Sequence, residues 1–225
     1  MALIVGIFHF IYQYVRRDKQ LVQKAKALKV SKLKELESRT QLEVLQAKIN
    51  PHFLYNSLNS LAVLAKEDPD KTEEMALALS RFLRYGVNRN EEPKTTLSEE
   101  LKMVKDYLAI EKIRYGEKLR FNIEIPSETK NELIPHFLLQ PLVENAIKHG
   151  RKNPENDFLI NLAFEKSEGQ LRIRIEDNGV PFPDDIQAGY GLKSVFEKLD
   201  LLYPGNYEIS FQNEPKKRVE ILLNV

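Results

Sequence analysis

QPLVENAIKHG, at residues 140–150, is the stretch of this 225-residue sequence that most directly predicts the fold. It indicates the last turns of a helix, which a glycine ends. Asn145 offers a neutral carbonyl oxygen, a ligand suited to Mg²⁺, and the adjacent Glu144 could polarise the ligand shell or an attacking group. Lys148 and His149 follow one turn later and could meet phosphate oxygens. These four side chains make the helix a candidate site for Mg²⁺ and phosphate.

EDNGV, at residues 176–180, indicates the end of a strand that leads into a turn. Asp177 could accept a hydrogen bond from an exocyclic amine, and Gly179 would let the backbone come close to a ring. Asp-Asn-Gly is also a common turn, so a purely structural role is the alternative for this stretch.

AGYGL, at residues 188–192, lies at the start of a predicted helix at about 190–203. Gly189 and Gly191 are expected to permit unusual dihedral angles, and amides just before a helix N-terminus favour phosphate. A Gly-x-Gly pair can also be a simple cap. Two interpretations follow for the three stretches: a nucleotide site, or caps and turns only.

The surrounding sequence predicts an α/β sandwich. Apolar alternation predicts strands at 119–125, 158–164, 171–177, 207–211 and 219–225. Helical stretches lie between them at about 98–115, 136–149 and 190–203. We expect a mixed sheet with one face covered by helices, and a domain boundary in EEPKTTL at 91–97, where Thr96 and Glu99 form a capping pair.

Taken together and in this order, the three stretches resemble the N box and the two glycine boxes of the GHKL ATP-binding fold. The resemblance implies that residues 97–225 bind ATP with Mg²⁺. It places Asn145 on the metal and Asp177 against the N6 amine of adenine. The segment between Asp177 and Gly191 is shorter than in that family, which favours a mobile lid or weak nucleotide retention.

Residues 50–92 predict a helical hairpin that begins at an unusual point. In KINPHFLYNSLN, at 48–59, a proline and His52 interrupt an amphipathic helix. At ~100° per residue, the apolar stripe after the proline lies roughly 150° around the helix axis from the stripe before it. A second amphipathic segment follows Asp68-Pro69. Two such helices form a hairpin, and two hairpins form a four-helix bundle in a dimer. The alternative for His52 is a residue packed at a kink.

The stretches INPHFLYNSLN, LSRFLRYGV, LSEELKMVKDYLAIEKIRYG and LIPHFLLQPLVENAIKHG are similar, in that order, to the LytS-type sensor histidine kinases. The resemblance covers nearly all of 40–225. It implies an α+β protein and a homodimer in which His52 accepts the γ-phosphoryl group of ATP and passes it to an aspartate of a response regulator. His136 departs from the family, where a second proline is commoner at this position.

The N-terminal part predicts membrane attachment. Residues 1–15 carry no charged side chain and are followed at once by Arg16 and Arg17, as at the cytoplasmic end of a transmembrane helix. Fourteen residues span only ~21 Å, so we expect a fragment of a longer span; an ordinary amphipathic or core helix is the alternative. Residues 16–49 predict a coiled-coil signalling linker. The expected location is a bacterial cell membrane, with the catalytic part in the cytoplasm.

Composition excludes several other classes. The chain has no cysteine, so disulfides and thiolate metal sites are excluded. Its net charge is +1, but nine Lys/Arg against three Asp/Glu lie in 16–39, so the remainder is net acidic and argues against nucleic-acid binding. The alternatives to a histidine kinase are another GHKL ATPase without histidine phosphotransfer, and a non-catalytic dimeric scaffold.

Overall fold

The computed structural model describes residues 51–87, 93–151, 157–183 and 189–225. The chain forms two compact units, Met1–Leu54 and Tyr55–Val225, and each is considered by itself. The predicted membrane segment at 1–15 and the predicted linker at 16–49 lie outside the described residues. Within the described ranges, no helix is both long and apolar enough to cross a bilayer.

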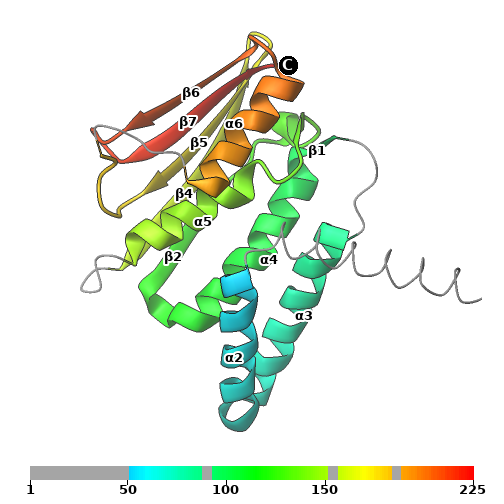
Figure 1. Ribbon diagram of the computed structural model, residues 1–225, viewed down its shortest axis with the longest axis vertical. Helices are drawn as coiled ribbons and strands as arrows, with labels where there is room; N and C mark the ends of the chain where they lie inside the picture. The colour runs from blue at the N-terminus through cyan, green and yellow to red at the C-terminus, as the bar shows by residue number, and fades with distance from the viewer. Residues whose placement is uncertain (1–50, 88–92, 152–156, 184–188) are drawn as a thin grey trace, which may run out of the picture. The chain divides into compact units, whose positions relative to one another are not determined.

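Two helices, α2 (Pro51–Glu67) and α3 (Pro69–Val87), are separated by one residue, Asp68 (Figure 1). The Asp68 carboxylate accepts a hydrogen bond from the backbone N–H of Lys71 at 3.0 Å, so Asp68 caps the start of α3. Pro69 follows at the first helical position, where its missing N–H would be unpaired in any case. The prediction of two helices that meet at Asp68-Pro69 is confirmed.

The predicted mixed sheet is present and has five strands in the order β2-β4-β5-β7-β6. β2 is parallel to β4, and the other neighbouring pairs are antiparallel. The strands are β2 (Leu119–Glu124), β4 (Phe158–Ser167), β5 (Gln170–Asp177), β6 (Tyr207–Gln212) and β7 (Arg218–Asn224). Each lies within a few residues of its predicted position.

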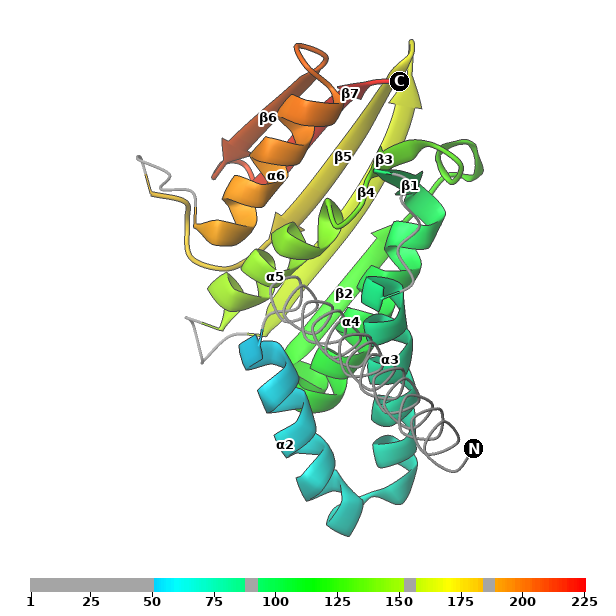
Figure 2. The same ribbon diagram turned by 45° about the vertical axis from the view of Figure 1, so that its right-hand side comes forward.

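Three helices, α4 (Leu97–Tyr115), α5 (Leu139–Gly150) and α6 (Tyr190–Leu202), cover one face of this sheet (Figures 1 and 2). Alternate strand residues such as Phe158, Ile160 and Leu162 are buried beneath them. The opposite face carries charged side chains, with Arg174 Nη2 2.8 Å from Glu165 Oε2. An apolar face under helices and a polar face opposite confirm the α/β sandwich.

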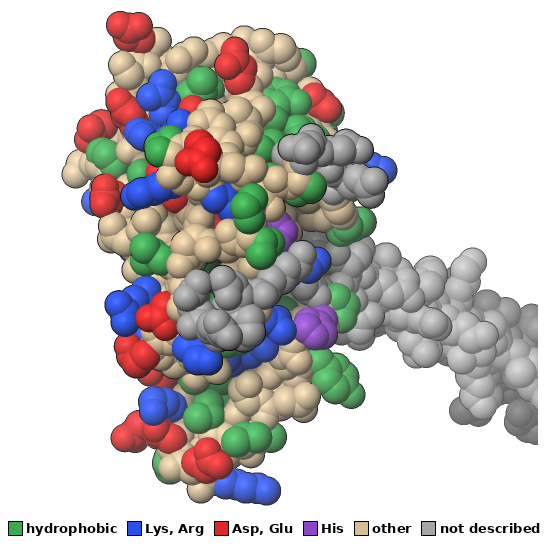
Figure 3. All heavy atoms as spheres, turned by 90° about the vertical axis from the view of Figure 1, so that its left-hand side faces the viewer, with side chains coloured by type: hydrophobic (Ala, Val, Ile, Leu, Met, Phe, Trp, Pro, Cys, Tyr) green, Lys and Arg blue, Asp and Glu red, His purple; other side chains and the backbone are tan. Residues whose placement is uncertain are grey.

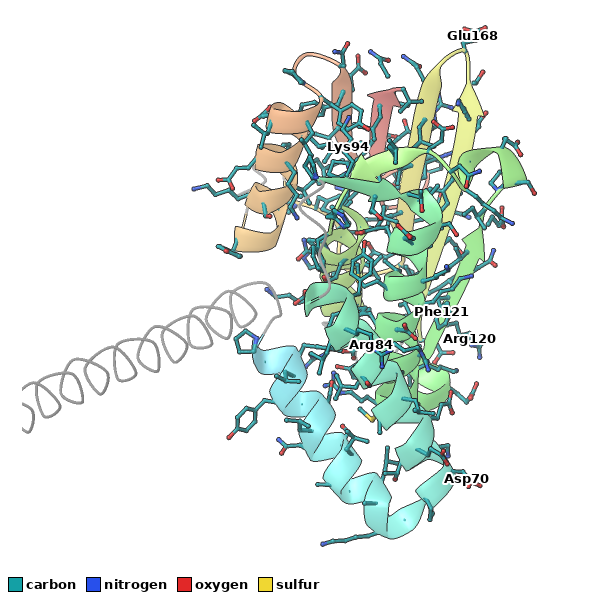
Figure 4. The ribbon with its side chains drawn as sticks, turned by 90° about the vertical axis from the view of Figure 1, so that its right-hand side faces the viewer. Asp70, Arg84, Lys94, Arg120, Phe121 and Glu168 are labelled. Carbon is teal, nitrogen blue, oxygen red and sulfur yellow. The ribbon has the colours of Figure 1, made fainter. Side chains whose placement is uncertain are left out.

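A second, two-stranded sheet was not predicted. β1 (Lys94–Thr96) pairs with β3 (Leu133–Pro135), so part of the predicted boundary segment 91–97 is a strand. Lys94 also lies over the ring of Tyr203, with Nζ 3.9 Å from the ring centroid (Figure 4). Three-residue strands are too short for alternation to reveal them. Thr96 caps α4 as predicted, by accepting a hydrogen bond from the backbone N–H of Glu99 at 3.2 Å.

The predicted helix at 136–149 was wrong at its start, because α5 begins at Leu139. Phe137 has a φ of 53°, a left-handed conformation that cannot belong to a helix. The fully buried Glu100 of α4 accepts hydrogen bonds from the backbone N–H groups of Phe137 at 3.0 Å and Leu139 at 3.1 Å. The Glu100 carboxylate therefore caps the start of α5, although it comes from another helix.

Tyr85 of α3 completes this cluster. Its hydroxyl donates to Glu100 Oε2 at 2.9 Å and lies 3.2 Å from His136 Nδ1. Because the Tyr85 proton points to Glu100, the Nδ1 of His136 acts as the donor to the tyrosine oxygen. Burial raises the pKa of Glu100, whereas the three hydrogen bonds lower it. α3, α4 and the start of α5 are thus joined through one carboxylate.

Candidate active site

The candidate site extends along α5. Near the start of this helix, a Cβ added to Gly191 would lie 3.4 Å from Pro141 Cβ, so the first turn of α6 lies against the first turn of α5. At the other end of α5, His149 is linked to Asp177, the last residue of β5, because both side chains contact the ammonium of Lys217. Pro141 and His149 are eight residues apart, or ~12 Å along a helix. Glu144 and Asn145 lie between them, and the helix therefore connects the predicted phosphate and base positions.

Glu144 and Asn145 are both half-buried on α5. The amide of Asn145 makes none of the hydrogen bonds found among the described residues, so its carbonyl oxygen is available to a ligand. Lys148, one turn later, is exposed. Within the described ranges, no three His, Asp or Glu side chains gather as a protein metal cage. An oxygen donor beside a carboxylate fits Mg²⁺, which usually keeps several waters and shares its shell with substrate phosphates.

Asp177 ends β5, and its carboxylate forms an ion pair with Lys217. Lys217 Nζ lies 2.7 Å from Oδ1 and 3.0 Å from Oδ2 of Asp177, and the two side chains are only 5% and 6% exposed. The same ammonium lies 3.1 Å from His149 Nδ1. Because a lysine ammonium can only donate, Nδ1 of His149 accepts and its proton sits on Nε2. The ring of Phe182 covers the ammonium, 4.5 Å from its centroid.

The backbone at the three glycines of the candidate site differs in part from the prediction. A Cβ at Gly179 would lie 2.7 Å from the backbone carbon of His149, so this glycine lets the turn after β5 pass the end of α5. The expectation of unusual dihedral angles at Gly189 and Gly191 was wrong. Gly189 has a φ of −64° and a ψ of 172°, which any residue adopts, and neither has a positive φ. Gly189 does precede α6, as predicted.

Glu111 is a carboxylate near the site that the sequence did not single out. It is 3% exposed on α4, and its Oε1 lies 2.6 Å from Arg114 Nη1. Its Oε2 has no hydrogen-bond partner among the described residues. The pKa of Glu111 is raised to about 7, mainly by burial and in smaller part by the charge of Glu144, against the opposing charges of Arg114 and Arg151. Glu111 therefore changes charge near neutral pH beside a predicted catalytic residue.

Replacing Glu111 by glutamine is expected to remove a pH-dependent loss of stability. The folded-state pKa of about 7 exceeds the ordinary 4.5, so the ionised form is disfavoured in the fold. The free energy of unfolding of the wild type should therefore fall as the pH rises between these values. At pH 8, Glu111→Gln should be more stable by ~3 kcal/mol, at 1.36 kcal/mol per pKa unit. Urea unfolding at pH 5 and pH 8 measures the difference.

Glu117→Gln is the matched control, because the Glu117 side chain is 92% exposed. This variant should follow the wild-type pH dependence. A stability gain of Glu111→Gln that is equal at both pH values would contradict a titrating Glu111.

His52 lies in the first turn of α2, and its side chain is exposed. It belongs to the unit Met1–Leu54, whereas the other predicted site residues belong to the unit Tyr55–Val225. An exposed imidazole fits a phosphoryl acceptor. The buried neighbour Phe53 shows that His52 is on the outer side of this turn.

A cavity of about 350 Å³ opens at the end of β5, and Asp177, Gly179 and Lys217 of the candidate site form part of its lining. Its lining includes Leu159, Asn161 and Glu176, which alternate with buried strand residues. Among the described residues, α5 contributes nothing to this lining. The cavity therefore adjoins the proposed base position at Asp177 but not the rest of the candidate site along α5.

Lys217 and Glu111 are the residues near the site that sequence reasoning missed. A signal for Lys217 exists in the strand pattern, because Val219, Ile221 and Leu223 point inward and the alternation places Lys217 inward as well. A lysine at such a position needs a buried partner. No comparable signal marks Glu111, whose burial depends on the packing of α4.

Residues 40–119 match the family described as Histidine kinase. The sensor histidine kinase BtsS of Escherichia coli (strain K12) is 34% identical over 193 residues, which cover 85% of this chain and 34% of that protein. The sensor protein LytS of Staphylococcus haemolyticus (strain JCSC1435) is 36% identical over 155 residues, which cover 69% of this chain and 26% of that protein. The chain therefore spans about a third or less of the length of these relatives.

Among solved structures, the histidine kinase domain of the blue-light activated histidine kinase from Erythrobacter litoralis EL346 is 16% identical, with a TM-score of 0.49. The match covers 84% of this chain and 93% of that one. The fold assignment rests on the strand order and helix placement described above.

Proposed function

The chain belongs to the histidine kinase family, and from this premise we propose that it is the dimerisation and catalytic part of a sensor histidine kinase of a two-component system. It binds ATP along α5, transfers the γ-phosphoryl group to His52 and passes that group to an aspartate of a response regulator. One observation carries this proposal: α5 holds Glu144 and Asn145 and brings His149 to Asp177 at the end of β5.

Each site residue has a proposed role. Asp177 accepts a hydrogen bond from the exocyclic amine of adenine, and Gly179 forms the turn beside it. Lys148 and His149 line the nucleotide site at the base end of α5, where His149 is linked to Asp177 through Lys217. The backbone amides at Gly189 and Gly191 before α6 approach phosphate oxygens. When bound, Mg²⁺ neutralises charge on the transferring phosphoryl group, and Asn145 would hold it.

In the transfer step, the imidazole of His52 forms the new N–P bond while the bond from the γ-phosphorus to the bridging oxygen breaks and ADP leaves. Glu144 accepts a hydrogen bond from the attacking imidazole and so favours the proton loss that completes the step. The phosphohistidine then donates its phosphoryl group to the carboxylate of the response regulator.

The assembly is proposed to be a homodimer attached to a bacterial membrane through its N-terminal segment, with the catalytic part in the cytoplasm. Apolar side chains are visible among charged ones on the described surface (Figure 3). On α2, Tyr55, Leu58 and Val63 are 73%, 52% and 55% exposed. A row of exposed apolar residues on one helix supports contact with a second copy in a four-helix bundle.

Incubation with γ-labelled ATP and Mg²⁺ tests the proposal. Label that is lost in acid and retained in alkali is expected, because phosphohistidine has this stability and phosphoserine has the opposite one. ATP hydrolysis without such label would instead support a GHKL ATPase of another kind. Absence of nucleotide binding would support a non-catalytic scaffold.

A further inference from the structure

Lys217 occupies a position that the sheet itself determines. β5 and β7 are antiparallel with Glu176 opposite Arg218, so Asp177 is opposite Lys217, and the N–H of Asp177 donates to the Lys217 carbonyl at 3.1 Å. Lys217 is only 6% exposed. A buried ammonium is stable only when it is paired, so this lysine and the proposed adenine acceptor form a fixed unit.

The hydrogen bonds of Asp177 leave it one open position. A carboxylate offers about four lone-pair sites, two on each oxygen. Oδ1 accepts from Lys217 Nζ at 2.7 Å and from the Gly179 N–H at 2.9 Å, which fills it. Oδ2 accepts from Lys217 at 3.0 Å and, among the described residues, from no other group. Asp177 can therefore accept one further N–H donor, on Oδ2.

Adenine and guanine differ in how many donors they present. The Watson–Crick edge of adenine has one amine, at N6, beside the acceptor N1. The corresponding edge of guanine has two donors, N1–H and the N2 amine, which a carboxylate with both oxygens open would accept in parallel. With one position open, guanine keeps one donor group unpaired in every placement, and an unpaired polar group in a buried site is costly.

We propose that Lys217 selects adenine over guanine, because its ammonium fills one acceptor position on each oxygen of Asp177. The proposal rests on the proposed binding of ATP at Asp177. The lysine thus acts on base choice through the carboxylate that it holds.

Dissociation constants for ATP and GTP, measured by calorimetry on the wild type and on Lys217→Met, test this role. The wild type should prefer ATP. In Lys217→Met both oxygens of Asp177 are open to guanine, so the ratio of the GTP constant to the ATP constant should fall ~10-fold or more, about the value of one hydrogen bond to a charged group.

Two variants serve as controls. Lys216→Met makes the same chemical change at the next residue, whose side chain is 71% exposed, and should leave the ratio unchanged. Lys217→Arg keeps donors to both oxygens and should retain the ATP preference. If Lys217→Met does not fold, as judged by thermal unfolding, Lys217→Gln replaces it, because its neutral amide can point one N–H at the buried carboxylate while the second N–H points away, which leaves one oxygen open.

The outcomes separate this inference from the proposed function. A wild type that binds neither nucleotide overturns the proposed function. A wild type that prefers ATP, with the same preference in folded Lys217→Met or Lys217→Gln, overturns the role of Lys217 alone.

Discussion

Replacing His52 by glutamine is expected to abolish acid-labile phosphorylation and to leave ATP affinity within about twofold. Glutamine is polar and of similar reach, but its amide cannot form a phosphoramidate under these conditions. The nucleotide site is proposed to lie along α5, far from His52 in the sequence and in the other compact unit. The measurement is incorporation of label from γ-labelled ATP, with a parallel binding titration. The expected decrease is complete, the largest effect of any single substitution in this chain.

Asn59→Gln is the matched control for His52→Gln. Asn59 is an exposed polar residue on the same helix, seven positions and about two turns from His52. This variant should be labelled at the wild-type rate. Acid-labile label that persists in His52→Gln would show that another histidine is the acceptor. His136 and His149 are the candidates among the described residues.

Replacing Asn145 by alanine is expected to slow autophosphorylation by ~10²-fold or more, because metal ions supply several kcal/mol of charge stabilisation in phosphoryl transfer. Alanine removes the half-buried carbonyl oxygen proposed to hold Mg²⁺ on α5. Binding of ATP in the presence of a chelator should change little, since the adenine contacts remain. Titrations with and without Mg²⁺, together with single-turnover labelling, distinguish the two effects.

Asn161→Ala is a suitable control, because Asn161 belongs to the sheet face opposite α5. It should keep the wild-type labelling rate. Equal loss of ATP affinity in Asn145→Ala with and without Mg²⁺ would contradict a metal-binding role and indicate a structural one.

The main elements were predictable because their patterns are local. Alternating apolar residues in 171–177 and the helical spacing in 97–115 are visible without knowledge of their partners. The pairing of Asp177 with Lys217 was not predictable, because it depends on the register between two strands separated in the sequence by α6 and β6. The buried roles of Glu100 and Glu111 likewise depend on how α4 packs.

The glycines show a further reason for incomplete prediction. A glycine in a motif can allow an unusual backbone dihedral angle, the close approach of a ligand or the close approach of another chain segment. The sequence alone does not distinguish these three roles. At Gly179 the structure shows passage beside the end of α5, and at Gly189 it shows an ordinary extended residue. The stretches at 176–180 and 188–192 were identified correctly as strand end and helix start, whereas the stretch at 140–150 is nearly the whole of α5 and not only its last turns.

The hydrogen bond from Tyr85 to Glu100 has a consequence for protein engineering. Chimeras of sensor kinases join parts of two relatives, and a junction just before residue 93 would separate the helical hairpin from the α/β sandwich. A junction there would separate Tyr85 from the buried carboxylate that holds the start of α5. It would also separate Arg81 from Asp106, 2.8 Å away. A chimera that imports the part proposed to bind ATP should therefore carry α3 with it.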